Sequence, residues 1–507
     1  MGFWLFREIK GDSHVRIVLD FFVLCYASVK YFFDFTYICM ETLTFDVGII
    51  GSGPGGTEAA RILAAKGMKV ALIEESLVGG ECLHWGCIPS KVYLHSAHLY
   101  QTMTKMGAAF GVVADNVRFD FAKLVERRVK VVSMLHRGLE QGLKSLGVTV
   151  VAGRGTLVSA NVIRVKSATG EESELSVKHV ILATGSSPRV PEGVKVGGRI
   201  ITNREVFMLT EQPKSMLITG GGTVGCEMAS FFSSIGTKVT MVERADRLLM
   251  HEDAEVAAEL VKLLGRNDVT VDFGTNVKGL VDTGASVKVS LERAGGVIEE
   301  AEFEYVLVAA GRSLNTSVCD WASVGIELEE GGHGVKANGF LQTNVPNVYA
   351  IGDLRGKVLL AYTAEREGEI AAYHILGEKM DGEMIEMDYK AIPSVIFTHP
   401  EIASVGMSEE KARASGANVV VKKAMFAANS KALIMGERDG FVKVIADATT
   451  GVVIGVHIIG PDATTTIEKA TLAVDRGITA AQMLNAIAGH PVTSETLEEA
   501  LEMVVEV

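Results

Sequence analysis

Proline and cysteine are both scarce in this sequence of 507 residues, with 10 and 6 copies respectively. So few cysteines in so long a chain do not form a disulfide scaffold, which favours a reducing, cytoplasmic location and leaves redox or metal chemistry for any close pair. Basic residues are also in deficit, since 49 Lys and Arg stand against 62 Asp and Glu, for a formal net charge of −13. This charge repels nucleic acid and anionic membranes, so we expect a protein that acts on small molecules.

The sequence also lacks a membrane-spanning segment. Residues 1–39 are apolar and aromatic, but Asp20, Lys30 and Asp34 interrupt them, and a span needs about 18 uninterrupted apolar residues. The same charges argue against a signal peptide and a transit peptide. We interpret residues 1–39 as an appendage or a mis-assigned start, with a membrane-surface anchor as the alternative, because a clear strand pattern begins only after Met40.

Glycine, by contrast, is abundant, with 54 residues in the chain. With so little proline, this excess indicates tight backbone turns near a ligand and not flexible linkers. Charged residues at 22% and hydrophobic residues at 48% are ordinary for a globular protein, and the length predicts more than one domain.

The first glycine cluster lies between two strand patterns. Residues 45–50 read FDVGII and are followed by GSGPGG, which places Gly51, Gly53 and Gly56 at G-x-G-x-x-G spacing. An Ala-rich helical stretch and a second strand ending in Glu74 follow. The first glycine would permit a tight turn, the second the approach of a pyrophosphate to the helix N-terminus, and the third close helix–strand packing, while the acid would accept the ribose hydroxyls.

The same unit recurs later in the chain. Gly220, Gly222 and Gly225 repeat the spacing, and the next strand ends in Glu243, so that the acid follows the first glycine by 23 positions in both copies. Two accidental glycine turns would not share this length, and the sequence therefore predicts two dinucleotide sites.

The second site is expected to bind NAD. A glutamate at the end of the second strand accepts a free ribose 2′-OH, which favours NAD over NADP. Arg244 and Arg247 follow this glutamate, and because arginine can bind a 2′-phosphate, NADP is the alternative. FAD is a candidate for the other site.

A cysteine pair lies between the two units, in GGECLHWGCIPSK. Cys82 and Cys87 have four residues between them, unlike the C-x2-C of a zinc knuckle, and no second pair stands at ligand spacing. A redox disulfide is therefore favoured over a metal site, with two inert buried cysteines as the remaining alternative. A helix is predicted to start near Pro89, and its N-terminus together with Lys91 would stabilise a thiolate at Cys87.

These motifs together resemble the FAD-dependent pyridine nucleotide-disulfide oxidoreductases, over nearly all of residues 40–507. ILATGSSP (181–188) resembles the crossover out of the family's FAD domain, AAGRSLN (309–315) its return, and TNVPNVYAIGD (343–353) its second flavin motif. The resemblance implies an α/β fold with two Rossmann-like dinucleotide-binding domains and a C-terminal α+β dimerisation domain.

The resemblance also implies domain boundaries. After the appendage at 1–39, the expected regions are an FAD-binding domain at 40–188, an NAD-binding domain at 189–310, a central segment completing the FAD site at 311–387, and a dimerisation domain at 388–507.

Single residues receive roles by the same resemblance. Asp353 would bind the ribityl or phosphate region of FAD, and Glu227 would pair with Lys91 beside the flavin. The expected FAD contacts are Gly51, Gly53, Gly56, Glu74, Lys91, Thr184, Gly185 and Asp353. The expected NAD contacts are Gly220, Gly222, Gly225, Glu243 and Gly311.

GHPVTSE near the C-terminus carries the expected base. Taken alone, His490 before a proline would be a loop residue, Thr493 a cap of the following helix, and Glu495 a complement to its dipole. HPxxSE at this place is similar to the family's base motif, which implies that His490 takes the proton of the substrate thiol and that Glu495 orients it. In that family the base comes from the partner subunit, which implies an obligate homodimer.

Three later segments, 393–408, 427–432 and 455–463, most resemble the dihydrolipoamide dehydrogenases of this family. The implied reaction oxidises protein-bound dihydrolipoamide to lipoamide through Cys82, Cys87 and FAD and reduces NAD. Cys82 would exchange with substrate and Cys87 would face the flavin. The implied partners are the lipoyl domains of a 2-oxoacid dehydrogenase or glycine cleavage complex.

Other disulfide reductases of the family are the alternative. A glutathione-reductase-like enzyme typically has Tyr in place of Thr223 and basic residues in place of Glu243. Mercuric reductase would need an extra cysteine pair near the C-terminus, and this chain has no cysteine after Cys319. Soluble transhydrogenase lacks the paired active cysteines, which this chain has at Cys82 and Cys87. A non-catalytic dinucleotide-binding subunit is a further hypothesis. Such a subunit would need only the glycine motifs, so the presence of Cys82, Cys87, Lys91, Glu227 and His490 argues against it.

Some residues depart from the family pattern or receive no role. His84 and Trp85 stand where Asn and a smaller residue are usual, and Tyr362 replaces a frequent His. These departures bear on the redox potential and the substrate, and not on the class of reaction. His84, His95 and His98 are assigned no function.

Overall fold

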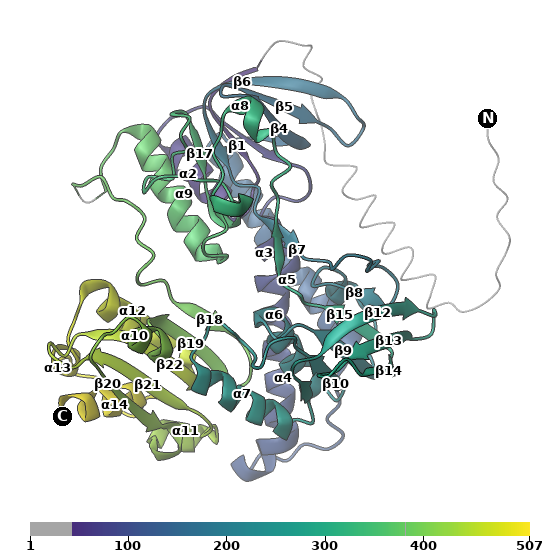
Figure 1. Ribbon diagram of the computed structural model, residues 1–507, viewed down its shortest axis with the longest axis vertical. Coiled ribbons are helices and arrows are strands. Elements are labelled where there is room, and N and C mark those ends of the chain that lie inside the picture. The colour runs from purple at the N-terminus through teal and green to yellow at the C-terminus, as the bar shows by residue number, and fades with distance from the viewer. Residues whose placement is uncertain (1–42, 381, 507) are drawn as a thin grey trace. The chain divides into compact units, whose positions relative to one another are not determined.

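The computed structural model describes residues 43–380 and 382–506 (Figure 1). The expectations for residues 1–39 lie outside these ranges. The described part is a mixed α/β protein with two sheets built around parallel strands and a third, antiparallel sheet near the C-terminus, which confirms the expected fold class. No helix among the described residues is long and apolar enough to cross a membrane.

The first sheet follows the first glycine motif. Its strands are β1 (Leu43–Ile50), β2 (Val70–Glu74), β3 (Thr149–Ala152), β4 (Arg154–Ser159), β5 (Val162–Lys166), β6 (Glu172–Leu182) and β17 (Val348–Ala350). β1, β2 and β3 are parallel, and β6 lies on the other side of β1. The chain order therefore reverses between β1 and β6, which is where open α/β sheets bind ligands. β1 from Val47 onward and β2 up to Ile73 are buried, as expected for strands covered on both faces.

Six helices of the described residues accompany this sheet in the chain. They are α2 (Pro54–Ala65), α3 (Gly80–Trp85), α4 (Cys87–Gln101), α5 (Phe121–Ser145), α8 (Trp321–Val324) and α9 (Ala361–Leu376). Of these, α2, α5 and α9 share its core, whereas α4 packs on the core of the second sheet. α2 and α9 touch through two glycines, because a Cβ on Gly55 would overlap the Ala364 carbonyl and a Cβ on Gly368 would overlap the Gly55 carbonyl. The late segment carrying β17 and α9 is thereby joined to the first motif.

The second sheet repeats this arrangement. It contains β8 (Ile200–Ile201), β9 (Ser215–Thr219), β10 (Lys238–Val242), β11 (Thr270–Asp272) and β15 (Tyr305–Val308), with helices α6 (Thr223–Ser234) and α7 (Ala254–Arg266). All neighbouring strands are parallel, in the order β11-β10-β9-β15-β8. The order reverses between β9 and β15, beside the second glycine motif.

Short antiparallel elements accompany the second sheet. β12 (Asn276–Asp282), β13 (Val287–Glu292) and β14 (Ile298–Phe303) form a three-stranded sheet. β7 (Ser186–Pro188) pairs with β16 (Arg312–Leu314), so the chain leaves for the second sheet and returns from it along two adjacent strands.

The C-terminal sheet is antiparallel throughout. Its order is β18 (Ser394–Ile396), β19 (Glu401–Gly406), β22 (Val453–Gly460), β21 (Phe441–Asp447) and β20 (Val419–Met425). The accompanying helices are α10 (Glu409–Ala414), α11 (Ser430–Met435), α12 (Ala463–Arg476), α13 (Ala480–Leu484) and α14 (Glu495–Val505). Apolar residues of the sheet, α12 and α14 share one core.

Two expected helix ends differ from the structure. α4 begins at Cys87 and not near Pro89, because proline occupies the first turn of a helix without loss of a hydrogen bond. The expected cap at Thr493 is wrong. α14 follows Ser494 with no side-chain cap, and the Thr493 hydroxyl donates to Asp462 Oδ2 at 3.0 Å instead.

Candidate active site

The first glycine loop leaves open space at its centre. Gly51 has φ +106°, a conformation that favours glycine, and a Cβ there would overlap the Ala183 carbonyl at the end of β6. Gly56 packs on the carbonyl of Gly51, whereas a Cβ on Gly53 would meet nothing within 4 Å. The backbone at Gly53 is therefore accessible to a ligand, and the outer glycines shape the turn that presents it.

Glu74 closes the same loop. Its carboxylate accepts hydrogen bonds from the Ser52 backbone N at 3.0 Å, the Ser52 hydroxyl at 2.6 Å and the Ser76 backbone N at 2.8 Å. A carboxylate has about four acceptor positions, so room for a ribose hydroxyl remains.

The second loop has the same geometry. Gly220 has φ +105°, and a Cβ on it would overlap the Ala309 carbonyl at the end of β15. Glu243 accepts from the Gly221 backbone N at 2.6 Å and the Ala245 backbone N at 2.8 Å. Gly222, Thr223 and Glu243 line a pocket beside this loop. The matched spacing in the sequence therefore corresponds to matched structure.

The helices after both loops have N-termini suited to a phosphate. α2 follows Gly53 and α6 follows Gly222, both glycines are extended, and neither helix has a side-chain cap or an acidic residue in its first turn. Uncapped backbone N–H groups and the positive end of the helix dipole favour an anion there. The residues present thus fit two dinucleotides with a pyrophosphate each.

Arg247 lines the same pocket, but its charge is paired. Its guanidinium forms a two-point ion pair with Glu410, at 2.8 and 3.0 Å. Arg244 is exposed. Glu243 and Arg247 both line the pocket beside the second loop, and the Glu243 carboxylate has no ion pair among the described residues.

Cys82 and Cys87 form a disulfide, with their Cα atoms 4.7 Å apart. Cys82 lies in α3, and Cys87 is the first residue of α4. Both cysteines therefore lie in the first turn of a helix, but Cys87 starts the much longer one, whose dipole is the stronger stabiliser of a thiolate.

One turn into α4, Lys91 pairs with Glu227. The Lys91 ammonium lies 2.8 and 3.0 Å from the two carboxylate oxygens of Glu227, which is buried in α6. The Phe397 backbone N also donates to Glu227, at 3.0 Å, and the Phe397 ring lies 4.5 Å from the Lys91 ammonium. These contacts connect the disulfide helix with the helix of the second glycine motif.

Asp353 lies in the 3₁₀ turn η5 (Gly352–Arg355) after β17. It accepts a hydrogen bond from the Ser186 hydroxyl, which in turn accepts from Arg312 Nε at 2.6 Å. Burial raises the pKa of Asp353 above its usual range. A polar carboxyl is therefore held at the end of β17, next to the two crossover strands.

Thr184, Gly185 and Gly311 lie at these crossovers. The Thr184 hydroxyl donates to the Asn315 carbonyl at 2.8 Å. Gly185 has φ +66° and Gly311 φ +101°. Gly185 lies two residues after Ala183, whose carbonyl faces Gly51. Gly311 lies two residues after Ala309, whose carbonyl faces Gly220.

His490 and Glu495 form a separate pair. The His490 Nδ1 donates to Glu495 Oε1 at 2.7 Å, and this hydrogen bond lowers the pKa of Glu495. The His490 side chain is 71% exposed. Within residues 43–380 and 382–506, no hydrogen bond or ion pair joins it to Cys82, Cys87 or Lys91. Glu495 thus orients an exposed imidazole that is not bonded to the disulfide of the same chain.

Several contacts around the disulfide have no local signal in the sequence. Glu81 accepts from Asn203 at 2.9 Å and forms an ion pair with Arg204 at 2.7 Å. His84 is buried and donates from Nε2 to the Val78 carbonyl at 2.8 Å. In the sequence, only their position next to the cysteine pair indicated that Glu81 and His84 could belong to the site.

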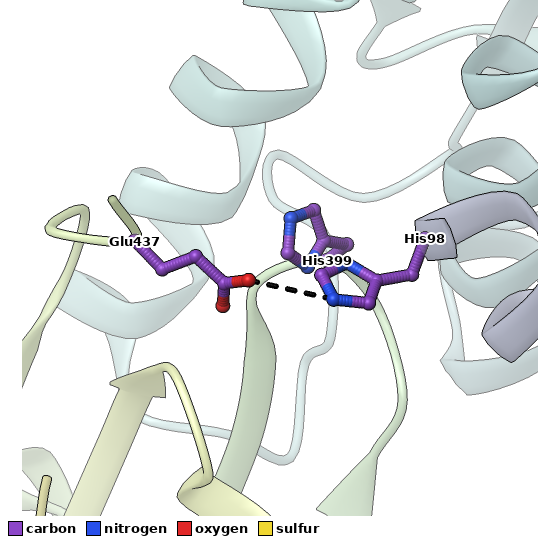
Figure 2. A group of neighbouring side chains, drawn as sticks. All are labelled: His98, His399 and Glu437. Carbon is purple, nitrogen blue, oxygen red and sulfur yellow. Dashed lines mark ion pairs between the residues drawn. The ribbon is translucent and has the colours of Figure 1, made fainter. Parts of the chain in front are cut away.

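A second group of polar side chains lies at the far end of α4. His98, His399 and Glu437 come from segments far apart in the sequence, and their ligand-type atoms all lie within 4.8 Å of one another (Figure 2). Burial lowers the pKa of His98, lowers that of His399 to about 4, and raises that of Glu437 to about 7.

Comparison with known proteins is consistent across the chain. Residues 45–368 match the family described as pyridine nucleotide-disulphide oxidoreductase, and residues 392–501 match its dimerisation domain. The chain is 38% identical over 457 residues to dihydrolipoyl dehydrogenase of Chlorobaculum tepidum, which covers 90% of this chain and 96% of that protein. It is 37% identical over 469 residues to dihydrolipoyl dehydrogenase of Bacillus subtilis, with 90% and 97% covered.

A solved structure agrees with these relatives. LpdA from Mycobacterium tuberculosis superposes with a TM-score of 0.83 at 28% identity and covers 90% of this chain and 99% of its own. Together with the paired glycine motifs and the Cys82–Cys87 disulfide, the matches show that the chain belongs to the pyridine nucleotide-disulphide oxidoreductase family.

Proposed function

We propose that the protein is a dihydrolipoyl dehydrogenase that uses FAD and NAD. The observation that carries the proposal is the Cys82–Cys87 disulfide at the start of α4, between two matched glycine loops. The curated relatives with this name, which align over 90% of the chain, support the same activity. The enzyme oxidises protein-bound dihydrolipoamide to lipoamide.

The chemical steps follow from thiol–disulfide exchange. A substrate thiolate attacks the Cys82 sulfur, the bond between the two cysteines breaks, and Cys87 leaves as a thiolate. The second substrate thiol then loses its proton and attacks the substrate sulfur bound to Cys82. This closes the cyclic disulfide of the product and releases Cys82 in reduced form. The substrate loses two electrons and two protons, and the cysteine pair gains the electrons.

His490 accepts a proton from the substrate thiol. Its Nδ1 hydrogen is engaged with Glu495, which leaves Nε2 as the acceptor. Because His490 is exposed and not bonded to the disulfide of its own chain, we expect each disulfide of a homodimer to be served by His490 of the second subunit. The match of residues 392–501 to a dimerisation domain supports this arrangement.

FAD, when bound, supplies the electron transfer between the reduced cysteine pair and NAD⁺. Gly51, Gly53, Gly56 and Glu74 hold its dinucleotide part. The other expected FAD contacts are Lys91, Thr184, Gly185 and Asp353. The expected NAD contacts are Gly220, Gly222, Gly225, Glu243 and Gly311. Lys91, oriented by Glu227, would supply a positive charge to bound FAD.

The domains are assigned accordingly. Residues 40–188 and 311–387 form the FAD-binding part, 189–310 the NAD-binding part, and 388–507 the dimerisation part. Lipoyl domains of a 2-oxoacid dehydrogenase or glycine cleavage complex are the proposed partners, and the few cysteines favour a reducing cytoplasm.

The test is turnover of the purified FAD-bound protein. Dihydrolipoamide with NAD⁺ should yield NADH, and anaerobic dithiol should reduce the protein by two electrons before NAD⁺ is added. Reduction of glutathione disulfide by NADPH at comparable kcat/KM would favour the glutathione-reductase-like alternative. A protein that binds FAD but is not reduced by dithiol would be a non-catalytic binding subunit.

A further inference from the structure

The group formed by His98, His399 and Glu437 lies outside the redox site. His98 belongs to the last turn of α4, His399 to the loop between β18 and β19, and Glu437 to the loop after α11. Figure 2 shows the Glu437 carboxylate directed toward the His98 ring, with the His399 ring beside it. His98 Nε2 lies 3.4 Å from Glu437 Oε1, and the two ring centroids are 4.3 Å apart.

Ordinary hydrogen bonding does not account for this arrangement. Among residues 43–380 and 382–506, no hydrogen bond joins an imidazole nitrogen of His98 or His399 to another group, and the approach of His98 Nε2 to Glu437 Oε1 at 3.4 Å is an ion pair only if the imidazole is protonated. All three side chains are partly buried. The two rings are tilted by 55° to one another, and within the described part of the chain His98 Nε2 has Glu437 as its only charged partner. Partly buried imidazole nitrogens without hydrogen bonds are costly unless a further group binds them.

We propose that His98, His399 and Glu437 bind a divalent transition-metal ion of the Zn²⁺ class. Two imidazole nitrogens and one carboxylate oxygen form a three-ligand set that leaves one tetrahedral position for water. Ligand atoms in a tetrahedral shell lie roughly 3.4 Å apart for metal–ligand distances near 2.1 Å, which matches the 3.4 Å between His98 Nε2 and Glu437 Oε1. Ca²⁺ and Mg²⁺ prefer oxygen ligands and are not expected.

The ion would connect three segments that the chain brings together only by folding. α4 begins at Cys87, so a metal at His98 would anchor the disulfide helix at its other end to the C-terminal sheet. The site is independent of the proposed redox activity, because none of its ligands contacts the cysteines. A ligand that binds only the folded state raises its stability by mass action.

The experiment is a Zn²⁺ titration by isothermal calorimetry. It uses untagged, FAD-bound protein in the disulfide form, after treatment with EDTA and dialysis, so that no free thiolate of the pair competes. The variants are His98→Gln, His399→Gln and Glu437→Gln. His95→Gln is the matched control, since His95 is an exposed histidine on the same helix.

We expect one Zn²⁺ per subunit in the wild type and in His95→Gln. Each of the three ligand variants should bind at least about 10²-fold more weakly, since loss even of an outer partner of a metal ligand costs 10- to 100-fold. No binding by the wild type, equal binding by all variants, or loss of the site in His490→Gln would overturn the proposal.

X-ray absorption of the Zn²⁺-loaded wild type gives a second measurement that needs no variant. Only nitrogen and oxygen neighbours, with the scattering of two imidazoles, should surround the metal. Sulfur in the shell would place the ion at the cysteines and would overturn the proposal.

Discussion

The two cysteines of the disulfide differ in their surroundings. Cys87 is the first residue of the 15-residue helix α4, which also carries Lys91, whereas Cys82 is the third residue of the six-residue helix α3. Cys82→Ser should therefore leave Cys87 as a thiolate that iodoacetamide alkylates rapidly below neutral pH, and its FAD-bound form should absorb at long wavelength. Cys87→Ser should show neither property. Both variants should lose dihydrolipoamide oxidation and keep FAD.

The control is His490→Gln, which should retain the disulfide and become slow in reduction by dithiol, by about 10²- to 10⁴-fold as for a lost general base. If Cys87→Ser instead shows the long-wavelength absorption and the rapid alkylation by iodoacetamide, the roles of the two cysteines are reversed.

Selectivity for the nicotinamide cofactor depends on Glu243. Its carboxylate is fixed by two backbone N–H groups, and the neighbouring Arg247 is paired with Glu410. We expect kcat/KM to favour NAD over NADP on the order of 10²-fold, because a 2′-phosphate would face a like charge. Glu243→Gln should lower the ratio of kcat/KM for NAD to that for NADP, mainly by raising kcat/KM for NADP. Equal efficiencies in the wild type would contradict this assignment.

His84 should make stability depend on pH. Burial lowers its pKa, so below about pH 6.5 the unfolded state binds more protons than the folded state. The stabilisation is complete above that pH and is lost as pH falls. The free energy of unfolding should therefore fall from pH 7 to pH 5 more steeply in the wild type than in His84→Asn, by at most about 1.4 kcal/mol per pH unit.

Urea unfolding of the FAD-bound protein measures this difference. His95→Asn, which removes an exposed histidine from α4, should follow the wild type. A wild-type slope no steeper than that of His84→Asn would show that His84 does not titrate in the way its burial indicates.

Local spacing decided which site residues could be predicted from the sequence. The glycines, the acids that follow them and the cysteine pair are encoded within short windows, and the structure places them in matched loops. Residues whose contacts come from distant segments gave no such signal. His98 was noticed and assigned nothing, because His399 and Glu437 approach it only in the folded chain.

At the scale of elements, the contact between α2 and α9 depends on the absence of side chains. A Cβ on Gly368 would overlap the carbonyl of Gly55. Gly368→Ala should therefore lower the free energy of unfolding by about 1–3 kcal/mol, as overpacking does, and weaken FAD retention, because α2 carries the first glycine motif.

Gly142→Ala is the matched control. Gly142 lies inside α5, and a Cβ there would meet nothing within 4 Å. This substitution should raise stability by up to about 1 kcal/mol through helix propensity. Similar effects of the two substitutions in thermal or urea unfolding would show that the helices separate easily.

Helix boundaries were less predictable than helix existence. The pattern after the cysteines located α4, but the expected start near Pro89 missed its first turn, which a proline can occupy. The cap expected at Thr493 failed because its hydroxyl bonds to Asp462, a tertiary contact that outweighs the local preference.

At the scale of the whole molecule, the separation of His490 from the disulfide predicts complementation between inactive subunits. Cys87→Ser and His490→Gln subunits, coexpressed, should form mixed dimers with one intact site each. Random pairing in a twofold-symmetric dimer then restores about a quarter of the wild-type activity.

Each variant expressed alone is the control and should be nearly inactive. If both groups acted within one subunit, the mixed dimers would contain no intact site and the coexpressed sample would also stay inactive. Separate affinity tags allow the mixed dimers to be isolated and assayed directly.

The domain pattern could be anticipated because repeated motifs mark repeated sheets. The sequence pattern could not indicate how β17 pairs with β6 or how α9 packs on α2. In both cases the whole second sheet lies between the two partners in the sequence.

The position of β17 has a consequence for synthesis of the chain on the ribosome. β6 ends at Leu182, yet the strand that covers its edge ends only at Ala350. At about 5–20 residues per second, roughly ten to thirty seconds pass between them. During that interval the second sheet can close, because its strands are contiguous, while the edge of the first stays open to chaperones. Nascent chains arrested after Ala310 should therefore contain a protease-resistant second sheet and a protease-sensitive first one.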